Sequence, residues 1–259
     1  MSVDNYAGAA RGWAEGASLV YRPIADQLLT SSPHPLKGRV VLDAGAGTGV
    51  ASAALSKLGA RPVAIDLSYD MLAWNARHRP PAMVADITRL PMRDRSVDDI
   101  VAAFVYNHLT CPELALAEAV RVSRPGGALL ACVYANTNRS EVRDALDEAA
   151  RGEGWRTPDW YVEIKQTATP LLGTAEDMAR VAAQSKLVDV HVNERAVDVG
   201  VTKAEQLVDY RLGQAHFAPW LNSLDPGRVE EIRDRLIDVI RPVMVPYRPI
   251  VVFLSALVP

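Results

Sequence analysis

The sequence predicts an α/β fold in which a mainly parallel, seven-stranded sheet carries helices on both faces. Short apolar runs of strand length alternate along the chain with apolar patterns of helical period. Helical crossovers between successive strands place those strands parallel in one sheet. A glycine-rich turn joins the first strand to the first helix after it. Because such sheets bind ligands at the carboxyl ends of their strands, we expect the functional site at that edge.

Length and composition fit one large globular domain or a domain with a lid. The 259 residues include 49% hydrophobic and 23% charged side chains, and the net charge is −3. No run of Lys or Arg suggests a nucleic-acid partner, and no apolar stretch is long enough to span a bilayer. Cys111 and Cys132 lack the spacing of metal ligands, and the segment around Asp4 lacks a signal pattern. We therefore expect a cytoplasmic protein with no metal, membrane or nucleic-acid partner; its oligomeric state is unknown.

An N-terminal helical arm is expected over residues 1–36. Apolar side chains share one helical face within residues 2–30, and Pro23 could open a second helix through Leu29. Residues 31–35 combine serines and prolines that break the helix. The arm therefore precedes a core that we expect over residues 37–135.

The first strand leads into a turn with three glycines. The strand Val40–Leu42 ends at Asp43, and the glycines follow at Gly45, Gly47 and Gly49. Glycine allows positive φ and lets a ligand lie on the peptide plane, while the N–H groups of the next helix point at that ligand. A dinucleotide-binding turn would place its third glycine at position 50, which is Val50, and no Lys-Ser/Thr pair follows as in a phosphate-binding P-loop. A turn whose glycines only relieve steric strain is the alternative.

The next strands also end in acidic residues. The strand 62–65 ends at Asp66, whose carboxylate could accept hydrogen bonds from both hydroxyls of a ribose or could only cap the following turn. Ser68 caps a helix that we expect to run to about Arg77, with Met71 near its start. The strand 82–85 ends at Asp86, and the strands 99–103, 128–134, 188–199 and 250–254 complete the sheet. Helices are expected between them over residues 48–58, 112–122, 174–186, 202–212 and 225–240.

These motifs together resemble the class I S-adenosylmethionine-dependent methyltransferases, and most closely the small-molecule enzymes of ubiquinone and menaquinone biosynthesis and their natural-product relatives. The resemblance is carried by the glycine loop, Asp66, Asp86-Ile87, Leu90-Pro91 and Arg124-Pro125-Gly126-Gly127. It covers residues 38–134, and residues 174–258 by the order of their elements. Val97 replaces the usual Phe before Asp98. The resemblance implies a Rossmann-like sheet whose last strand runs antiparallel between strands five and six.

The resemblance implies that S-adenosyl-L-methionine is the cofactor. The cofactor-binding residues that we expect are Asp43, Gly45, Ala46, Gly47, Gly49, Asp66, Leu67, Met71, Asp86, Ile87 and Phe104, with Trp13 and Tyr21 folding over from the arm. In this family the acid after strand three faces the adenine amino group, and the end of strand four meets the methionine part. The alternatives are that Asp86 only forms a turn and that Trp13 and Tyr21 only pack the arm onto the core.

Two histidines are candidate general bases. His108 stands where many family members have a His-Leu or His-Val pair, and His216 lies in the second insertion described below. A structural hydrogen-bonding role is the alternative for His108, and packing in a small core within the lid is the alternative for His216. Residues 104–108 contain no proline, whereas methyltransferases that act on DNA adenine or glutamine carry an Asn/Asp-Pro-Pro-aromatic turn here. Those two activities are therefore disfavoured.

Two insertions interrupt the predicted core. Residues 136–173 and 201–247 are expected to pack together as a lid, while residues 174–200 continue the core and residues 248–259 carry the last strand. Aromatic side chains are enriched in both insertions, and a small core within the lid is the alternative role for most of them. A lid of this composition suits a flat, aromatic or apolar small molecule and excludes water.

The predicted activity is transfer of a methyl group to a C, O or N atom of a small molecule by in-line displacement. The alternative is an S-adenosylmethionine-binding protein of the same fold that catalyses a cyclisation or rearrangement, or only binds. A nicotinamide-dependent dehydrogenase is disfavoured by Val50.

Overall fold

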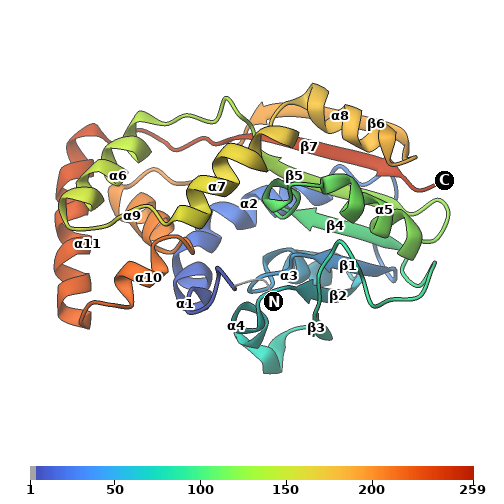
Figure 1. The fold of residues 1–259 in the computed structure, drawn as a ribbon, viewed down its shortest axis with the longest axis horizontal. Helices are drawn as coiled ribbons and strands as arrows, with labels where there is room; N and C mark the ends of the chain where they lie inside the picture. The colour runs from blue at the N-terminus through green and yellow to red at the C-terminus, as the bar shows by residue number, and fades with distance from the viewer. Residues whose placement is uncertain (1–3) are drawn as a thin grey trace.

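A seven-stranded sheet forms the centre of the computed structural model, which describes residues 4–259. The order is β3-β2-β1-β4-β5-β7-β6, and β7 runs antiparallel to both β5 and β6 (Figure 1). The strands are β1 (Val40–Ala44), β2 (Arg61–Asp66), β3 (Ala82–Val84), β4 (Asp99–Ala103), β5 (Ala128–Tyr134), β6 (Val188–Ala196) and β7 (Ile250–Leu257). The predicted fold class is confirmed. The strand order reverses between β1 and β4, where sheets of this kind bind ligands.

Helices cover both faces of the sheet, as predicted. They include α2 (Ser18–Leu29), α3 (Val50–Lys57), α5 (Pro112–Val122) and α8 (Ala175–Gln184). Val41 faces the helices α2 and α3, whereas its neighbour Leu42 faces α5 and α8. Both side chains are fully buried. Strands that are buried on both faces need apolar residues at successive positions, which explains the near-continuous apolar runs in the sequence.

The N-terminal arm is one continuous helical segment and not two helices. It consists of α1 (Ala10–Gly12), a π-helix (Trp13–Ala17) and α2, and the first residues of the predicted 2–30 helix lie outside the described residues. The prediction that Pro23 opens a helix is wrong, because Pro23 lies inside α2. Proline removes one backbone hydrogen bond, but the helix continues because its apolar face, including Ile24 and Leu28, is fully buried.

Several predicted boundaries need correction. Helix α4 (Tyr69–Ala73) ends before Arg77 because Asn75 takes a left-handed conformation with φ of 51°, and a 3₁₀ turn (Ala76–His78) follows. Strand β6 stops at Ala196 and does not reach residue 199.

The start of α9 (Ala204–Leu212) is one residue later than its capping pattern predicts. The side chain of Gln206 accepts hydrogen bonds from the backbone N–H groups of Thr202 and Lys203, so Lys203 is the N-cap. The sequence pattern predicts that Thr202 and Glu205 form the capping pair. In the structure the side-chain amide of Gln206 takes that role, because its oxygen accepts from both N–H groups.

The two insertions pack against each other, and most of their helices lie at one end of the molecule, on the left in Figure 1. The first contains α6 (Glu141–Gly152) and α7 (Asp159–Thr167), and the second contains α9, α10 (Ala218–Leu221) and α11 (Pro226–Ile240). The sequence predicted neither α7 nor α10. Trp155 from the first insertion stacks on Phe217 from the second, with ring centroids 4.1 Å apart, and both side chains are buried. These two aromatics therefore form the small internal core that was the alternative reading.

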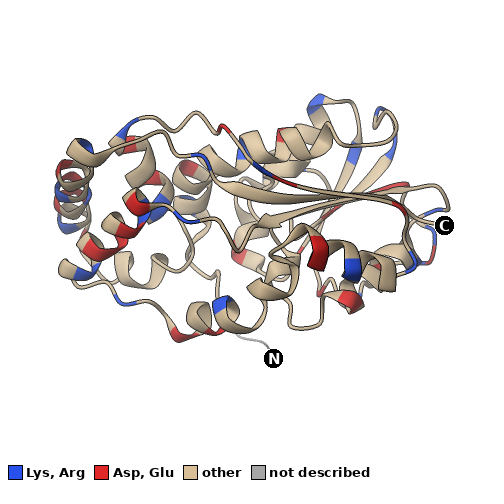
Figure 2. Cartoon of the chain, turned by 90° about the horizontal axis from the view of Figure 1, so that it is seen from above, with Lys and Arg blue, Asp and Glu red and all other residues tan. Residues whose placement is uncertain are grey.

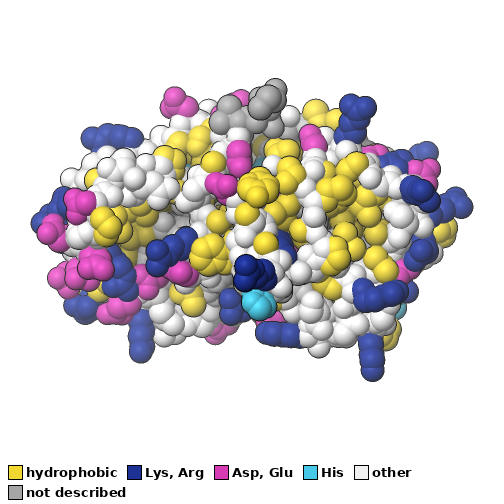
Figure 3. Space-filling model, turned by 90° about the horizontal axis from the view of Figure 1, so that it is seen from below, with side chains coloured by type: hydrophobic (Ala, Val, Ile, Leu, Met, Phe, Trp, Pro, Cys, Tyr) yellow, Lys and Arg dark blue, Asp and Glu magenta, His cyan; other side chains and the backbone are white. Residues whose placement is uncertain are grey.

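Residues of both charge signs occur along the helices at this end of the molecule (Figure 2). They include cross-element ion pairs such as Arg228 with Glu153 at 2.7 Å and Arg233 with Asp209 at 2.6 Å. On the face in Figure 3, hydrophobic side chains form patches with charged side chains of both signs around them. Within residues 4–259, no helix combines the length and the hydrophobicity that crossing a membrane requires.

Candidate functional site

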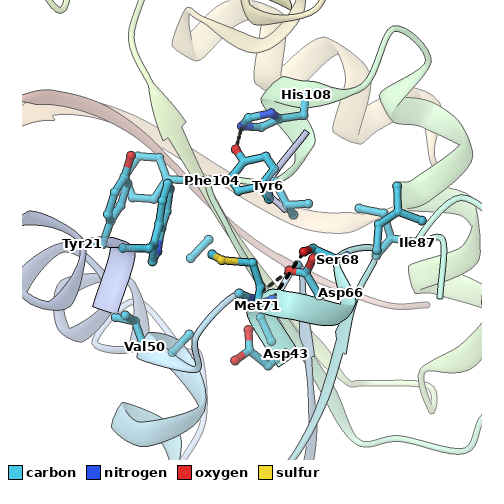
Figure 4. A pocket seen from close by; sticks show the side chains of 18 of the residues that line it. Tyr6, Tyr21, Asp43, Val50, Asp66, Ser68, Met71, Ile87, Phe104 and His108 are labelled. Carbon is cyan, nitrogen blue, oxygen red and sulfur yellow. Dashed lines mark hydrogen bonds between the residues drawn. The ribbon is translucent and has the colours of Figure 1, made fainter. Parts of the chain in front are cut away.

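A cavity of about 300 Å³ lies at the carboxyl ends of β1, β2, β3 and β4 (Figure 4). The predicted residues that line it are Trp13, Tyr21, Asp43, Gly45, Ala46, Gly47, Asp66, Leu67, Met71, Asp86, Ile87, Phe104 and His108. Two predicted residues lie elsewhere. Gly49 is the N-cap of α3 with φ of 96°, behind the cavity wall, and His216 lines a second cavity described below. The structure thus brings most of the predicted site residues together.

Neighbouring side chains lie so close to two residues of the loop, Gly45 and Gly47, that a larger residue would not fit there without a change. Gly45 has φ of 72°, and a Cβ placed on it would lie 2.5 Å from Cβ and Cγ2 of Val105 at the end of β4. A Cβ on Gly47 would point between Met71 and Trp13, which both line the cavity, with Met71 Cε 3.4 Å away. Side chains at these positions would therefore push β4 away or fill the cavity.

The first three N–H groups of the glycine loop are hydrogen-bonded within the protein. The N–H groups of Gly45 and Ala46 donate to the carbonyl of Ile65 at 2.8 and 2.9 Å. The N–H of Gly47 donates to the Asp66 carboxylate at 2.7 Å. These three donors are therefore already used inside the protein, where they shape the cavity.

Asp43 is a buried carboxylate beside the cavity. Its side chain is 1% exposed and accepts a hydrogen bond of 2.6 Å from the Ser52 hydroxyl. Burial raises the pKa of Asp43 to about 6, and the hydrogen bonds from Ser52 oppose that rise. At neutral pH the carboxylate is therefore ionised in an apolar setting, where a cationic ligand group would stabilise it.

Asp66 and Asp86 both hold the loops that follow their strands. Asp66 accepts from the N–H of Gly47 and, at 2.9 Å, from the N–H of Ser68, and each carboxylate oxygen keeps a further acceptor position. Asp86 accepts from the backbone N–H and the hydroxyl of Thr88 at 2.8 and 2.7 Å. The turn-forming role considered for each is present, and both side chains also line the cavity.

The sequence did not reveal Arg79 or the first described residues as parts of the site. Arg79 donates to the carbonyl oxygens of Gly47 at 3.1 Å and of Leu72 at 2.7 Å, which ties α4 to the glycine loop. Asp4 accepts from the Ser68 hydroxyl at 2.8 Å, so the N-terminal segment crosses the cavity mouth. No periodic pattern or motif marks either segment in the sequence.

Aromatic side chains form the wall at the far end of the cavity (Figure 4). Tyr21 stacks on Trp13 with ring centroids 4.8 Å apart and meets the edge of Phe104 at 4.9 Å. The backbone of Phe104 is in the left-handed region with φ of 60°, which is unfavourable for a bulky side chain. His108 Nε2 lies 3.5 Å from the hydroxyl of Tyr6, and burial lowers the pKa of His108 to about 4.

A second cavity of about 230 Å³ lies behind this wall, between the core and the two insertions. The side chains that line both cavities are Tyr6, Trp13, Tyr21, Phe104, His108 and Ile164. His216 lines the second cavity, is 4% exposed and stacks on Tyr161 with ring centroids 3.9 Å apart. Burial, and then the charge of Arg211, lowers the pKa of His216 well below its usual range. Both histidines are therefore neutral at pH 7.

The central part of the chain matches the model of a protein family described as a methyltransferase domain, over residues 42–131. Residues 42–131 form a methyltransferase domain. The match contains the glycine loop, Asp66, Asp86 and Phe104, and it confirms the resemblance to class I S-adenosylmethionine-dependent methyltransferases. It supports S-adenosylmethionine as the cofactor of this domain.

Individual relatives agree with this methyltransferase domain. The chain is 36% identical over 138 residues to the demethylmenaquinone methyltransferase of Mycolicibacterium paratuberculosis, which covers 50% of this chain and 60% of that protein. The curated relatives of this name are therefore matched over about half of their length.

Solved structures agree on the fold. A chain of the Haloferax volcanii complex between the Trm112 methyltransferase activator and a methyltransferase has a TM-score of 0.62, with 19% identity and 100% and 99% coverage of the two chains. Haemonchus contortus phosphoethanolamine N-methyltransferase 2, solved with S-adenosyl-L-methionine, has a TM-score of 0.57 with 18% identity, over 91% of this chain and 52% of the other. Identities this low establish the fold alone.

Proposed function

We propose that this protein transfers the methyl group of S-adenosylmethionine to a C, O or N atom of a small molecule with a flat face. The observation that carries the proposal is the pair of cavities with a common aromatic wall. The first lies at the strand ends of a methyltransferase domain, and the second lies directly behind it. A donor in the first cavity and an acceptor in the second would meet at Phe104 and His108.

The residues of the first cavity fit the chemical groups of the cofactor. The ionised carboxylate of Asp43 suits the ammonium of the amino-acid tail, and the spare acceptor positions of Asp66 suit the ribose hydroxyls. Ile87 is buried beside Asp86 and offers an apolar surface to the adenine ring. The cofactor would supply a methyl group bound to a positively charged sulfur; the acceptor atom would bond to this methyl carbon in line, and the sulfur would leave as the thioether of S-adenosylhomocysteine. The protein then has to hold donor and acceptor in alignment.

Two neutral histidines can receive the proton of an acceptor hydroxyl, amine or acidic carbon. His108 lies in the common wall, and His216 lies deeper in the second cavity. We assign the general base to His108 first, because it is the one that borders both cavities. The test compares turnover of His108→Gln and His216→Gln with one acceptor. Full turnover in both variants would refute a general-base role for either histidine.

Ligand binding and product formation test the proposal itself. We expect S-adenosylhomocysteine to raise the thermal unfolding midpoint and NAD to leave it unchanged. With S-adenosylmethionine and a panel of small aromatic acceptors, we expect S-adenosylhomocysteine to form only when an accepted ring is present. Stabilisation by NAD alone would contradict the cofactor assignment. Conversion of a ring without S-adenosylhomocysteine formation would support the non-methylating alternative, which the comparisons do not favour.

A further inference from the structure

The second cavity contains polar atoms that the protein itself leaves without partners. Asn107 Oδ1, Thr169 Oγ1 and His216 Nε2 are buried and have no hydrogen-bond partner within residues 4–259. Their side chains are 9%, 7% and 4% exposed, and all three residues line this cavity. Buried polar atoms normally have partners, because leaving one unpaired costs about 1–3 kcal/mol. Three residues that line this cavity therefore carry an unpaired polar atom, so its wall is partly polar.

The arginines around the cavity differ in how completely they are paired. Arg211 is buried and forms a bidentate ion pair with Asp147, with two contacts of 2.6 Å, and it also bonds to Gln214. Arg143 is 21% exposed, and in the part of the chain that the structure describes its side chain donates one hydrogen bond, to the Asn138 carbonyl at 3.3 Å. Its nearest carboxylate is that of Asp144, which lies 3.8 Å away and is 66% exposed. Arg143 therefore keeps most of its donors available.

Positive charge exceeds negative charge in the cavity wall. Arg211 and Asp147 neutralise each other, which leaves Arg143 and Lys165 opposite the single solvated carboxylate of Asp144. Aromatic rings make up much of the remaining wall, including Tyr161, Trp160 and Tyr134. The volume of about 230 Å³ exceeds the roughly 150 Å³ that suffices for a benzene ring in an apolar protein cavity. One ring with one or two substituents fits this space.

We propose that the acceptor is a small aromatic molecule with an anionic substituent, a carboxylate or a phosphate, which Arg143 pairs with in the second cavity. The proposal rests on the function proposed above and adds the substrate class. Arg143 offers a planar set of donors that matches either anion in a bidentate arrangement. Asn107, Thr169 and His216 add polar character to the wall around the ring. The common wall at Phe104 places the ring beside the methyl donor.

Binding of three probes to the protein tests this without turnover. Benzoate and phenyl phosphate carry the two candidate anions, and benzamide is the neutral counterpart of similar shape. Titrations by calorimetry, with and without saturating S-adenosylhomocysteine, should show benzoate or phenyl phosphate binding at least about tenfold more tightly than benzamide. The tighter of the two anions identifies the substituent. If neither benzoate nor phenyl phosphate binds more tightly than benzamide, the proposal is wrong.

Two arginine variants locate the effect. Arg143→Gln should remove the preference for the anion while leaving the affinity for S-adenosylhomocysteine within about twofold of the wild type. Arg139→Gln is the matched control, because Arg139 is exposed, precedes α6 and does not line the cavity. It should keep the preference. A preference that survives in Arg143→Gln would refute the role of Arg143. Failure of S-adenosylhomocysteine to bind would refute the proposed function instead, and the probe titrations without it would still report the anion site.

Discussion

The variant Asp43→Asn tests two effects of the buried charge: its effect on the free energy of unfolding and its effect on cofactor affinity. Asp43 is almost completely buried and ionised at neutral pH, and its acceptor bond from Ser52 can be kept by the amide oxygen of Asn. The variant therefore removes the charge with little change of shape. We expect it to make the cofactor-free protein more stable and to weaken cofactor binding.

The magnitude and its sign follow from the pKa. Burial raises the pKa of Asp43 from the usual 3.8 to about 6, so the folded protein binds more protons than the unfolded chain between these two values. The contribution of this group to the free energy of unfolding therefore falls as pH rises from about 4 to about 6, by about 3 kcal/mol, and is constant above. Asp43→Asn lacks this decline, so its gain in stability reaches up to about 3 kcal/mol at pH 7.5 and vanishes near pH 4.

Urea unfolding at pH 4.5, 6.0 and 7.5, followed by circular dichroism, measures the first effect. Calorimetry with S-adenosylhomocysteine measures the second, and we expect the affinity of Asp43→Asn to fall at least about tenfold at pH 7.5 because a charge-assisted hydrogen bond is lost. Asp26→Asn is the control, since Asp26 is exposed on α2 and should change neither quantity. Unchanged stability at pH 7.5 would refute the buried-charge argument, and unchanged affinity would refute the role of Asp43 in binding.

Two further substitutions test how the cavity is shaped. Gly45→Ala should lower the free energy of unfolding by about 3 kcal/mol and abolish S-adenosylhomocysteine binding, because it combines backbone strain with a 2.5 Å contact. Gly38→Ala shares the positive φ but has open space around it, so a cost of about 1 kcal/mol is expected, and equal losses in both variants would contradict the close-approach argument. Arg79→Met should reduce stability by about 2 kcal/mol and weaken cofactor binding, because three carbonyl groups lose their donor. Arg77→Met, at an exposed position, should do neither, and denaturant unfolding with ligand titration measures both pairs.

The fold was predictable because each core strand carries its own signal. The strand that ends at Asp43 and the helix that Pro112 opens have apolar patterns that local chain geometry can satisfy, and the structure keeps them. The predicted helix boundaries were wrong where tertiary packing or a local turn sets the end of a helix. Pro23 lies within a helix because a buried face holds α2 together, and Asn75 ends α4 early by a left-handed turn that no periodicity reveals.

The first cavity could be predicted in outline because its residues follow strand ends at one edge of a parallel sheet. Asp43, Asp66 and Asp86 are placed there by topology alone. The second cavity could not be predicted in the same way. Its polar residues come from separate segments, such as Asn107 after β4 and Arg143 in α6, and only the tertiary structure brings them together. Arg211 is hydrogen-bonded to a largely buried carboxylate, whereas the carboxylate nearest to Arg143 is exposed and 3.8 Å away, and sequence spacing does not encode this difference.

The common wall also couples ligand binding in the first cavity to ligand binding in the second. Tyr6, Trp13 and Tyr21 belong to the N-terminal arm, and they line both cavities together with Phe104. The unfavourable backbone of Phe104 persists because its N–H bonds to Cys132 at 2.8 Å and its ring is held between Tyr21 and Tyr134. Any ligand that packs on this wall from one side stabilises the arrangement that the other side needs. Because linkage is reciprocal, we expect cofactor and acceptor each to tighten the binding of the other by the same factor.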